Sequence, residues 1–148
     1  MVKKVILTPN PYRDGGFKTV LAAQKILQEA GIETRMCLPF EVDKSFVLPK
    51  DIRFSRLDRE LNWADMVICF GGDGTILHMA KAATRHRLPI LGVNIGTMGF
   101  IAELESTELA DLSRIASGEY TMDSRLMLDV TIRRGNDVVF HDLALNDV

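Results

Sequence analysis

A glycine-rich stretch at positions 71–75 has the composition of a phosphate-binding loop. It consists of Gly71, Gly72, Asp73, Gly74 and Thr75, and it lies between a short apolar run and a segment with helical spacing. Glycines allow backbone N–H groups to approach a phosphate closely, and the positive end of a following helix favours its charge. The stretch therefore predicts a phosphate cradle with the Asp73 carboxylate pointing into it; a tight turn with a capping residue is the alternative. It is neither a Walker A loop nor a GxGxxG fingerprint.

Two further polar segments also follow apolar runs. The first extends from Asn94 to Phe100 and contains Gly96. Asn94 offers an amide that can donate and accept hydrogen bonds, and Phe100 offers a flat ring on which a base can stack. The second segment is the pair Asn146 and Asp147, near the end of the chain. Taken alone, an aromatic residue such as Phe100 is more often part of a core, and an Asn-Asp pair is more often a plain turn.

The elements that must position these segments alternate between strand-like and helix-like patterns. Short apolar runs or period-two alternation predict strands, and helical spacing predicts the helices between them. The strands are expected at 5–7, 32–38, 66–70 and 90–93, and the helices at 17–30, 76–84 and 107–118. This order predicts an α/β fold with a Rossmann-like open parallel sheet. Ligands bind at the carboxyl ends of the strands in such sheets, so the two glycine-bearing loops are expected to face each other across a crevice.

The pattern changes near Met122. Apolar and polar residues alternate from 126 to 132, a hairpin turn signal follows at 134–137, and another strand comes after it. The chain then stops in an apolar-rich stretch without a stop signal. We therefore predict an α/β nucleotide-binding domain over 1–122 and the first hairpin of a truncated all-β domain over 123–148.

The composition is that of a soluble protein without a nucleic-acid or membrane partner. Among its 148 residues 18 are basic and 20 are acidic, so the net charge of −2 provides no basic surplus for a phosphate backbone or an anionic membrane. The longest purely apolar run, 66–70, is far shorter than the roughly 18 residues that cross a bilayer. Cys37 and Cys69 are expected to be reduced core thiols, which favours a cytoplasmic location. No cluster of acidic, His or Cys residues predicts a structural metal site.

Together the three motifs resemble the bacterial NAD kinase family. GGDGT at 71–75, Asn-x-Gly-x-x-Gly-Phe at 94–100 and Leu-Asn-Asp at 145–147 occur in the order, and at about the spacing, of that family. Phosphofructokinases and the diacylglycerol and sphingosine kinases share the first motif, and the other two narrow the choice to NAD kinase. The resemblance covers essentially the whole chain. It implies a phosphofructokinase-like sheet domain followed by an all-β NAD-binding domain, in a longer protein that forms a homo-oligomer.

The resemblance also implies roles for individual residues. Asp73 matches the catalytic aspartate that accepts the proton of the adenosine 2′-hydroxyl of NAD, and Phe100 matches the aromatic ring that packs against the NAD adenine. Asn146 and Asp147 match the asparagine–acid pair that holds the nicotinamide-side ribose, where many members have Glu in place of the Asp. The other nucleotide-binding candidates are Gly71, Gly72, Gly74, Thr75, His78, Asn94 and Gly96. Among these, His78 matches a position that is variable in the family.

The implied activity is ATP-dependent phosphorylation of NAD to NADP. Neither glycine-bearing loop contains a lysine or arginine that could hold the triphosphate, so Mg²⁺ or another divalent cation is the expected charge partner. Two alternatives remain: another kinase with a GGDGT loop, acting on a lipid or a sugar, or a nucleotide-binding module without turnover. The 148 residues alone are expected not to form NADP at a useful rate, because family members build the site between two domains.

Overall fold

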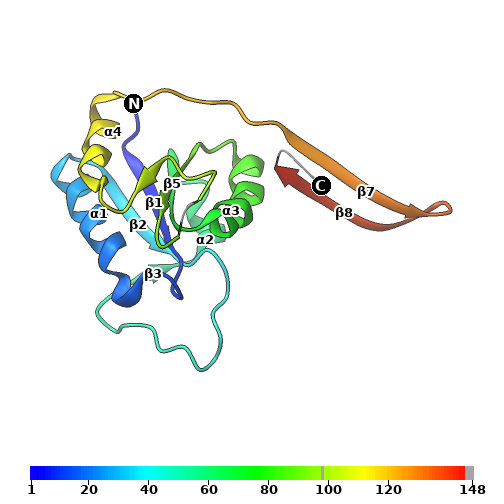
Figure 1. The fold of residues 1–148 in the computed structure, drawn as a ribbon, viewed down its shortest axis with the longest axis horizontal. Coiled ribbons are helices and arrows are strands. Elements are labelled where there is room, and N and C mark those ends of the chain that lie inside the picture. The colour runs from blue at the N-terminus through cyan, green and yellow to red at the C-terminus, as the bar shows by residue number, and fades with distance from the viewer. Residues whose placement is uncertain (98, 146–148) are drawn as a thin grey trace.

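Six parallel strands form a central sheet in the order β3-β2-β1-β4-β5-β6 (Figure 1). The structure is a computed structural model that describes residues 1–97 and 99–145. In chain order the strands are β1 (Lys4–Pro9), β2 (Glu33–Cys37), β3 (Phe54–Ser55), β4 (Met66–Gly71), β5 (Ile90–Asn94) and β6 (Leu104–Glu105). Every neighbouring pair is parallel, so the predicted open parallel α/β sheet is confirmed.

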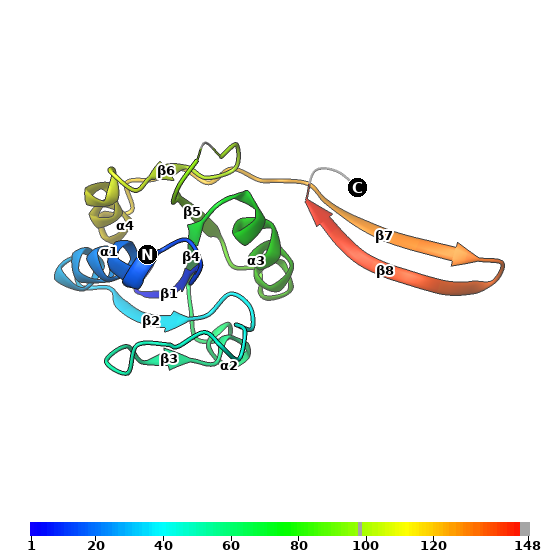
Figure 2. The same ribbon diagram turned by 60° about the horizontal axis from the view of Figure 1, so that its bottom comes forward.

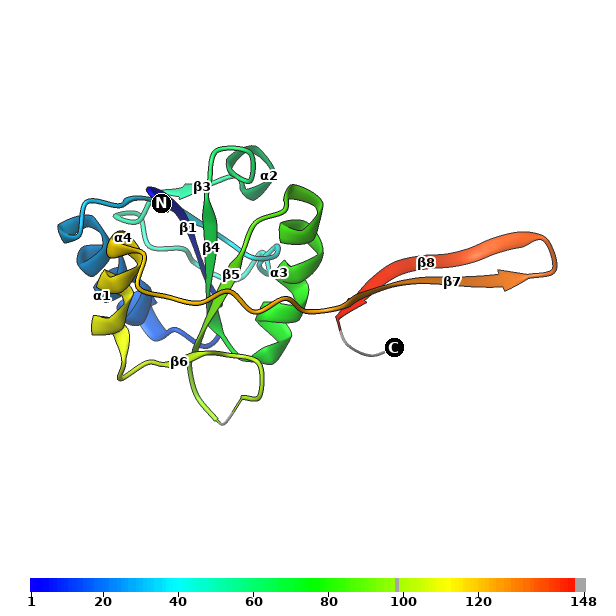
Figure 3. The same ribbon diagram turned by 90° about the horizontal axis from the view of Figure 1, so that it is seen from above.

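Helices cover both faces of this sheet and produce three layers (Figure 2, Figure 3). On one face, α1 (Lys18–Glu29) lies beside the 3₁₀ turn η2 (Leu109–Ser113) and the single-turn helix α4 (Arg114–Ser117). On the other face lie α2 (Leu57–Glu60) and α3 (Asp73–His86). Cover on both faces explains why the central strands are continuously apolar rather than alternating. Within the described ranges, no helix is both long and apolar enough to cross a membrane.

The sheet divides the core into two clusters. In β1, Val5 and Leu7 are buried on the α1 side, whereas Ile6 between them faces α3. In β4, Cys69 lies on the same side as Ile6. Burial raises the pKa of both Cys69 and Cys37 to about 12, so the two free thiols stay protonated at neutral pH. The prediction that they are core thiols is confirmed.

The start of α1 is held by a buried carboxylate from the preceding turn. Phe17, immediately before the helix, has a left-handed backbone conformation (φ 57°) and makes no side-chain cap. Instead Asp14, which is 2% exposed, accepts hydrogen bonds from the backbone N–H groups of Thr19 (3.0 Å) and Val20 (2.9 Å). A carboxylate in this place also interacts favourably with the positive end of the helix dipole. The helix stops before Gly31 (φ 83°), as predicted.

Two helices differ from the expectation. α3 begins at Asp73 rather than at 76, because Gly72 takes the N-cap position and an acidic residue is favourable in the first turn. Three residues of GGDGT therefore belong to the helix. Thr107 does not begin a regular α-helix, since the chain makes the 3₁₀ turn η2 and then a single α-helical turn. Leu112 and Ile115 are both buried in this segment, and a 3₁₀ turn aligns residues three apart.

A two-stranded antiparallel hairpin, β7 (Met127–Arg134) and β8 (Asp137–Leu145), extends away from the sheet (Figure 1). The predicted hairpin is therefore present, and the domain boundary near Met122 stays a prediction. Lys81 on α3 forms a salt bridge with Asp142 on β8. The hydrogen bond from this ammonium group is the main cause that lowers the pKa of the Asp142 carboxyl.

Removal of the Asp14 carboxylate is expected to destabilise the protein. Asp14→Ala leaves the Thr19 and Val20 N–H groups without their acceptor, which should lower the free energy of unfolding by about 1–2 kcal/mol. Urea denaturation followed by circular dichroism measures this change. Asp51→Ala, at an exposed aspartate, is the matched control and should unfold like the wild type. Equal midpoints for the two variants would contradict the capping role.

Candidate active site at the carboxyl edge of the sheet

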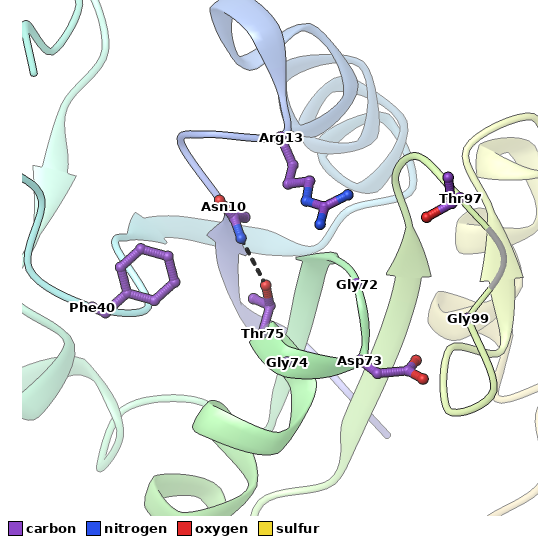
Figure 4. A pocket seen from close by; sticks show the side chains of 9 residues that line it. All are labelled: Asn10, Arg13, Phe40, Gly72, Asp73, Gly74, Thr75, Thr97 and Gly99. Atoms are coloured by element: carbon purple, nitrogen blue, oxygen red, sulfur yellow. Dashed lines mark hydrogen bonds between the residues drawn. The ribbon is translucent and has the colours of Figure 1, made fainter.

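A pocket of about 270 Å³ opens at the carboxyl edge of the sheet, beside the ends of β1 and β4 (Figure 4). The order of the strands changes direction at β1, because β2 and β3 lie on one side of it and β4, β5 and β6 lie on the other. Such a switch point leaves a crevice outside the strand ends, since the connecting segments leave in opposite directions. The described residues that line the pocket are Asn10, Arg13, Phe40, Gly72, Asp73, Gly74, Thr75, Thr97 and Gly99.

Asn10 ties the end of β1 to β4 and α3. Its side-chain amide donates a hydrogen bond to Thr75 Oγ1 (3.0 Å), and its backbone N–H donates to the Phe70 carbonyl (2.7 Å). Thr75 is buried, and Gly71 permits the close packing, because a Cβ at position 71 would lie 2.4 Å from Thr75 Oγ1. Asn10 therefore joins the end of β1 to β4 and to Thr75 of α3, and Gly71 leaves room for the Thr75 side chain.

Gly72 and Gly74 present bare backbone to the crevice. Both line the pocket, and a Cβ at either position would meet no atom within 4 Å. They are the N-cap residue and a first-turn residue of α3, whose first backbone N–H groups have no acceptor inside the helix. A helix N-terminus with open space before it suits a phosphate, and phosphate binding by this loop stays a prediction.

The Asp73 carboxylate joins the first glycine-bearing loop to the second. It accepts hydrogen bonds from the backbone N–H groups of Phe100 (3.0 Å) and Ile101 (3.2 Å). Figure 4 shows this carboxylate turned towards the loop that carries Gly99. A Cβ at Gly99 would lie 2.8 Å from Asp73 Oδ1, so the glycine leaves room for the carboxylate. The expected direction, into the phosphate cradle, therefore differs from the structure, in which Asp73 lies between the two motifs.

In the second motif, Asn94 is buried and Phe100 is exposed. Asn94 is 2% exposed, and its amide nitrogen donates to both carboxylate oxygens of Glu105 (3.2 and 3.1 Å). Gly96 has a φ of 113°, a conformation that favours glycine. Phe100 is 91% exposed, which excludes the core role that the sequence alone left open for it.

Three pocket residues come from segments that the sequence had not singled out. Asn10 and Arg13 follow β1, and Phe40 follows β2. The Phe40 ring stacks on Tyr12, with centroids 6.3 Å apart, and meets His78 edge-on at 5.8 Å. His78 is exposed and is not among the residues that line the pocket. These residues could have been found because each comes shortly after a strand. That signal identifies site residues only when the order of the strands in the sheet is known.

Two predicted ligand contacts, Asn146 and Asp147, lie outside the described residues. Their contact with a ribose therefore stays a prediction. In the ranges that the structure describes, no group of three or more His, Cys, Asp or Glu side chains could hold a metal ion.

Comparison with known proteins gives the family. The family model of the ATP-NAD kinase N-terminal domain matches residues 6–120. The chain belongs to the NAD kinase family. An NAD kinase of Mycobacterium bovis is 33% identical over 157 residues, covering 99% of this chain and 51% of that relative. An NAD kinase of Psychrobacter arcticus is 47% identical over 85 residues, covering 57% of this chain and 26% of that relative.

A solved structure shows the same fold. Yeast NADH kinase complexed with NADH aligns with a TM-score of 0.70 and 17% sequence identity, covering 97% of this chain and 46% of that chain. The resemblance to NAD kinases that the three motifs carried is thus confirmed. The chain spans about half the length of the Mycobacterium bovis relative.

Alanine substitutions at two glycines of the GGDGT motif are expected to differ in their effect on stability. Gly71→Ala places a methyl group 2.4 Å from Thr75 Oγ1. The backbone or the Thr75 side chain must shift to make room for this methyl group, which should lower the free energy of unfolding by about 1–3 kcal/mol. Gly74→Ala meets no atom within 4 Å in the first turn of α3. It should leave stability unchanged or raise it, because alanine favours a helix over glycine by about 0.5–1 kcal/mol. Thermal unfolding measures both, and equal destabilisation would contradict the packing described.

Proposed function

We propose that the complete protein transfers a phosphoryl group from ATP to the adenosine 2′-hydroxyl of NAD and so forms NADP. One observation carries the proposal: the Asp73 carboxylate is fixed beside the N-terminus of α3, in the crevice at the switch point of the sheet. Membership of the NAD kinase family supports NAD as the acceptor.

Phosphoryl transfer depends chiefly on position and charge. The backbone of Gly72 and Gly74 would hold donor phosphates at the helix N-terminus, where N–H groups and the dipole favour an anion. Asp73 would orient the acceptor hydroxyl and accept its proton. The amides of Phe100 and Ile101 use only part of its acceptor capacity, which is about four lone-pair sites, so a hydroxyl can still bind.

Mg²⁺ fits this proposal as a partner of the donor phosphates. The ion is usually bound through one or two carboxylates together with substrate phosphates, and it keeps several waters. Asp73 is the only carboxylate among the described residues that line the pocket, so phosphates and waters together would supply most of the ligands. When bound, the ion neutralises charge on the phosphates.

The acceptor is proposed to lie on the side of Asp73 that faces the second motif. Phe100 is 91% exposed there and can stack on an adenine ring, and the yeast NADH kinase of the same fold is described as complexed with NADH. Asn146 and Asp147 are proposed to hold the nicotinamide-side ribose. A cytoplasmic location of the complete protein is proposed from its core thiols, Cys37 and Cys69, and a homo-oligomeric state from the family resemblance.

Asp73→Asn is expected to remove most NADP formation by the complete protein while its fold stays intact. Asparagine keeps an oxygen that can accept from the loop amides, but it cannot act as a base. Loss of a positioned base should lower kcat by about 10²–10⁴-fold. NADP formed from ATP, Mg²⁺ and NAD is measured with an NADP-specific dehydrogenase, and circular dichroism verifies the fold.

The matched control is Asp111→Asn, at an exposed aspartate on η2, which should keep the wild-type kcat. A wild-type kcat for Asp73→Asn would contradict the role of this carboxylate. Phosphorylation of sphingosine or fructose 6-phosphate in place of NAD would refute the proposed acceptor.

A further inference from the structure

The crevice contains a positively charged side chain, Arg13, that has no role in the proposed transfer as described above. Arg13 follows β1, and its guanidinium points into the pocket between Asn10, Gly72 and Thr97 (Figure 4). Gly96 of the second motif lies against it, because a Cβ at position 96 would be 3.4 Å from Arg13 Nη1. The guanidinium therefore stands between the N-terminus of α3 and the second loop.

The backbone that carries Arg13 is fixed by a hydrogen-bonded turn. The N–H groups of Arg13 and Asp14 donate to the Asn10 carbonyl (3.1 and 3.0 Å), and Asn10 Oδ1 accepts from the Tyr12 N–H (3.0 Å). Asn10 is in turn bonded to Thr75, and the Asp14 carboxylate is bonded to α1. The start of the Arg13 side chain is thus positioned by the fold without any ligand.

The charge of Arg13 has no counter-ion among the described residues. Arg13 takes part in none of the ion pairs found there. Asp73, the only acidic residue in the described pocket lining, is bonded to the amides of Phe100 and Ile101 instead. The N-terminus of α3 adds a partial positive charge from the facing side. Both sides of the crevice therefore favour an anion.

We propose that Arg13 binds the phosphate chain of the donor nucleotide, opposite the backbone of Gly72 and Gly74. A guanidinium is planar, carries five N–H donors and pairs with a phosphate through two parallel hydrogen bonds. The inference rests on the proposed phosphoryl transfer, and it supplies the basic side chain that both glycine-bearing loops lack. Contacts on two sides hold the phosphate chain in one register, so the transferred group stays at a set distance from Asp73.

Initial rates of the complete protein at varied ATP and NAD test the proposal. Arg13→Gln removes the charged, two-point contact, which should raise KM for ATP about 10-fold or more and change KM for NAD by less than about 2-fold. Arg13→Lys keeps the charge but not the planar fork, so it should recover part of the loss. Arg59→Gln removes one exposed charge on α2 and is the matched control. An unchanged KM for ATP in Arg13→Gln would overturn the proposal.

Binding of inorganic tripolyphosphate, measured by calorimetry without NAD, separates this inference from the proposed function. The Kd should rise about 10-fold in Arg13→Gln and stay at the wild-type value in Arg59→Gln. If the wild type forms no NADP and this difference still appears, Arg13 is a phosphate-binding residue and the proposed function fails. If NADP forms and tripolyphosphate binds the wild type and Arg13→Gln equally, or binds neither, the Arg13 assignment fails alone. Thermal unfolding verifies that the variants are folded.

Discussion

The geometry of the crevice depends on one contact, between the Asp73 carboxylate and the backbone of the second loop. Hydrogen bonds to an ionised acceptor are roughly twice as strong as those between neutral groups. Because Asp73 also opens α3, the helix N-terminus and the second loop cannot shift independently of each other. Gly99 permits the contact, since any Cβ there would take the space of a carboxylate oxygen. Asp73, the proposed catalytic residue, therefore also determines the spacing of the two glycine-bearing loops.

Local apolar patterning was sufficient to predict the four longer strands of the sheet, but not the two-residue strands β3 and β6 or the single-turn helix α2. The uninterrupted apolar runs of β1 and β4 indicated strands covered on both faces, and GGDGT lies at the carboxyl end of β4 as expected. No local signal reports which strands are neighbours. Asn10, Arg13 and Phe40 enter the site only because β1 lies between β2 and β4, so the sequence could not single them out.

Two segments differ from what their local sequence favours. The 107–118 segment has the spacing of an α-helix, yet burial of Leu112 and Ile115 beside α1 is achieved with a 3₁₀ turn and a single helical turn. Phe100 has the type of a core residue, yet its side chain is 91% exposed while its backbone N–H is bonded to Asp73.

The adjacency of β1 and β4 also constrains the order of events during folding. The Thr8 hydroxyl bonds to the Ile68 carbonyl, 60 positions further along the chain. Closing a loop of that length costs conformational entropy before any contact compensates for it, and parallel pairing across such separations is slow. A growing polypeptide that has already formed β1, α1 and β2 therefore has no crevice. Asn10 and Thr75 meet only when β4 docks beside β1, so this edge of the sheet cannot be complete before residues 66–75 have joined it.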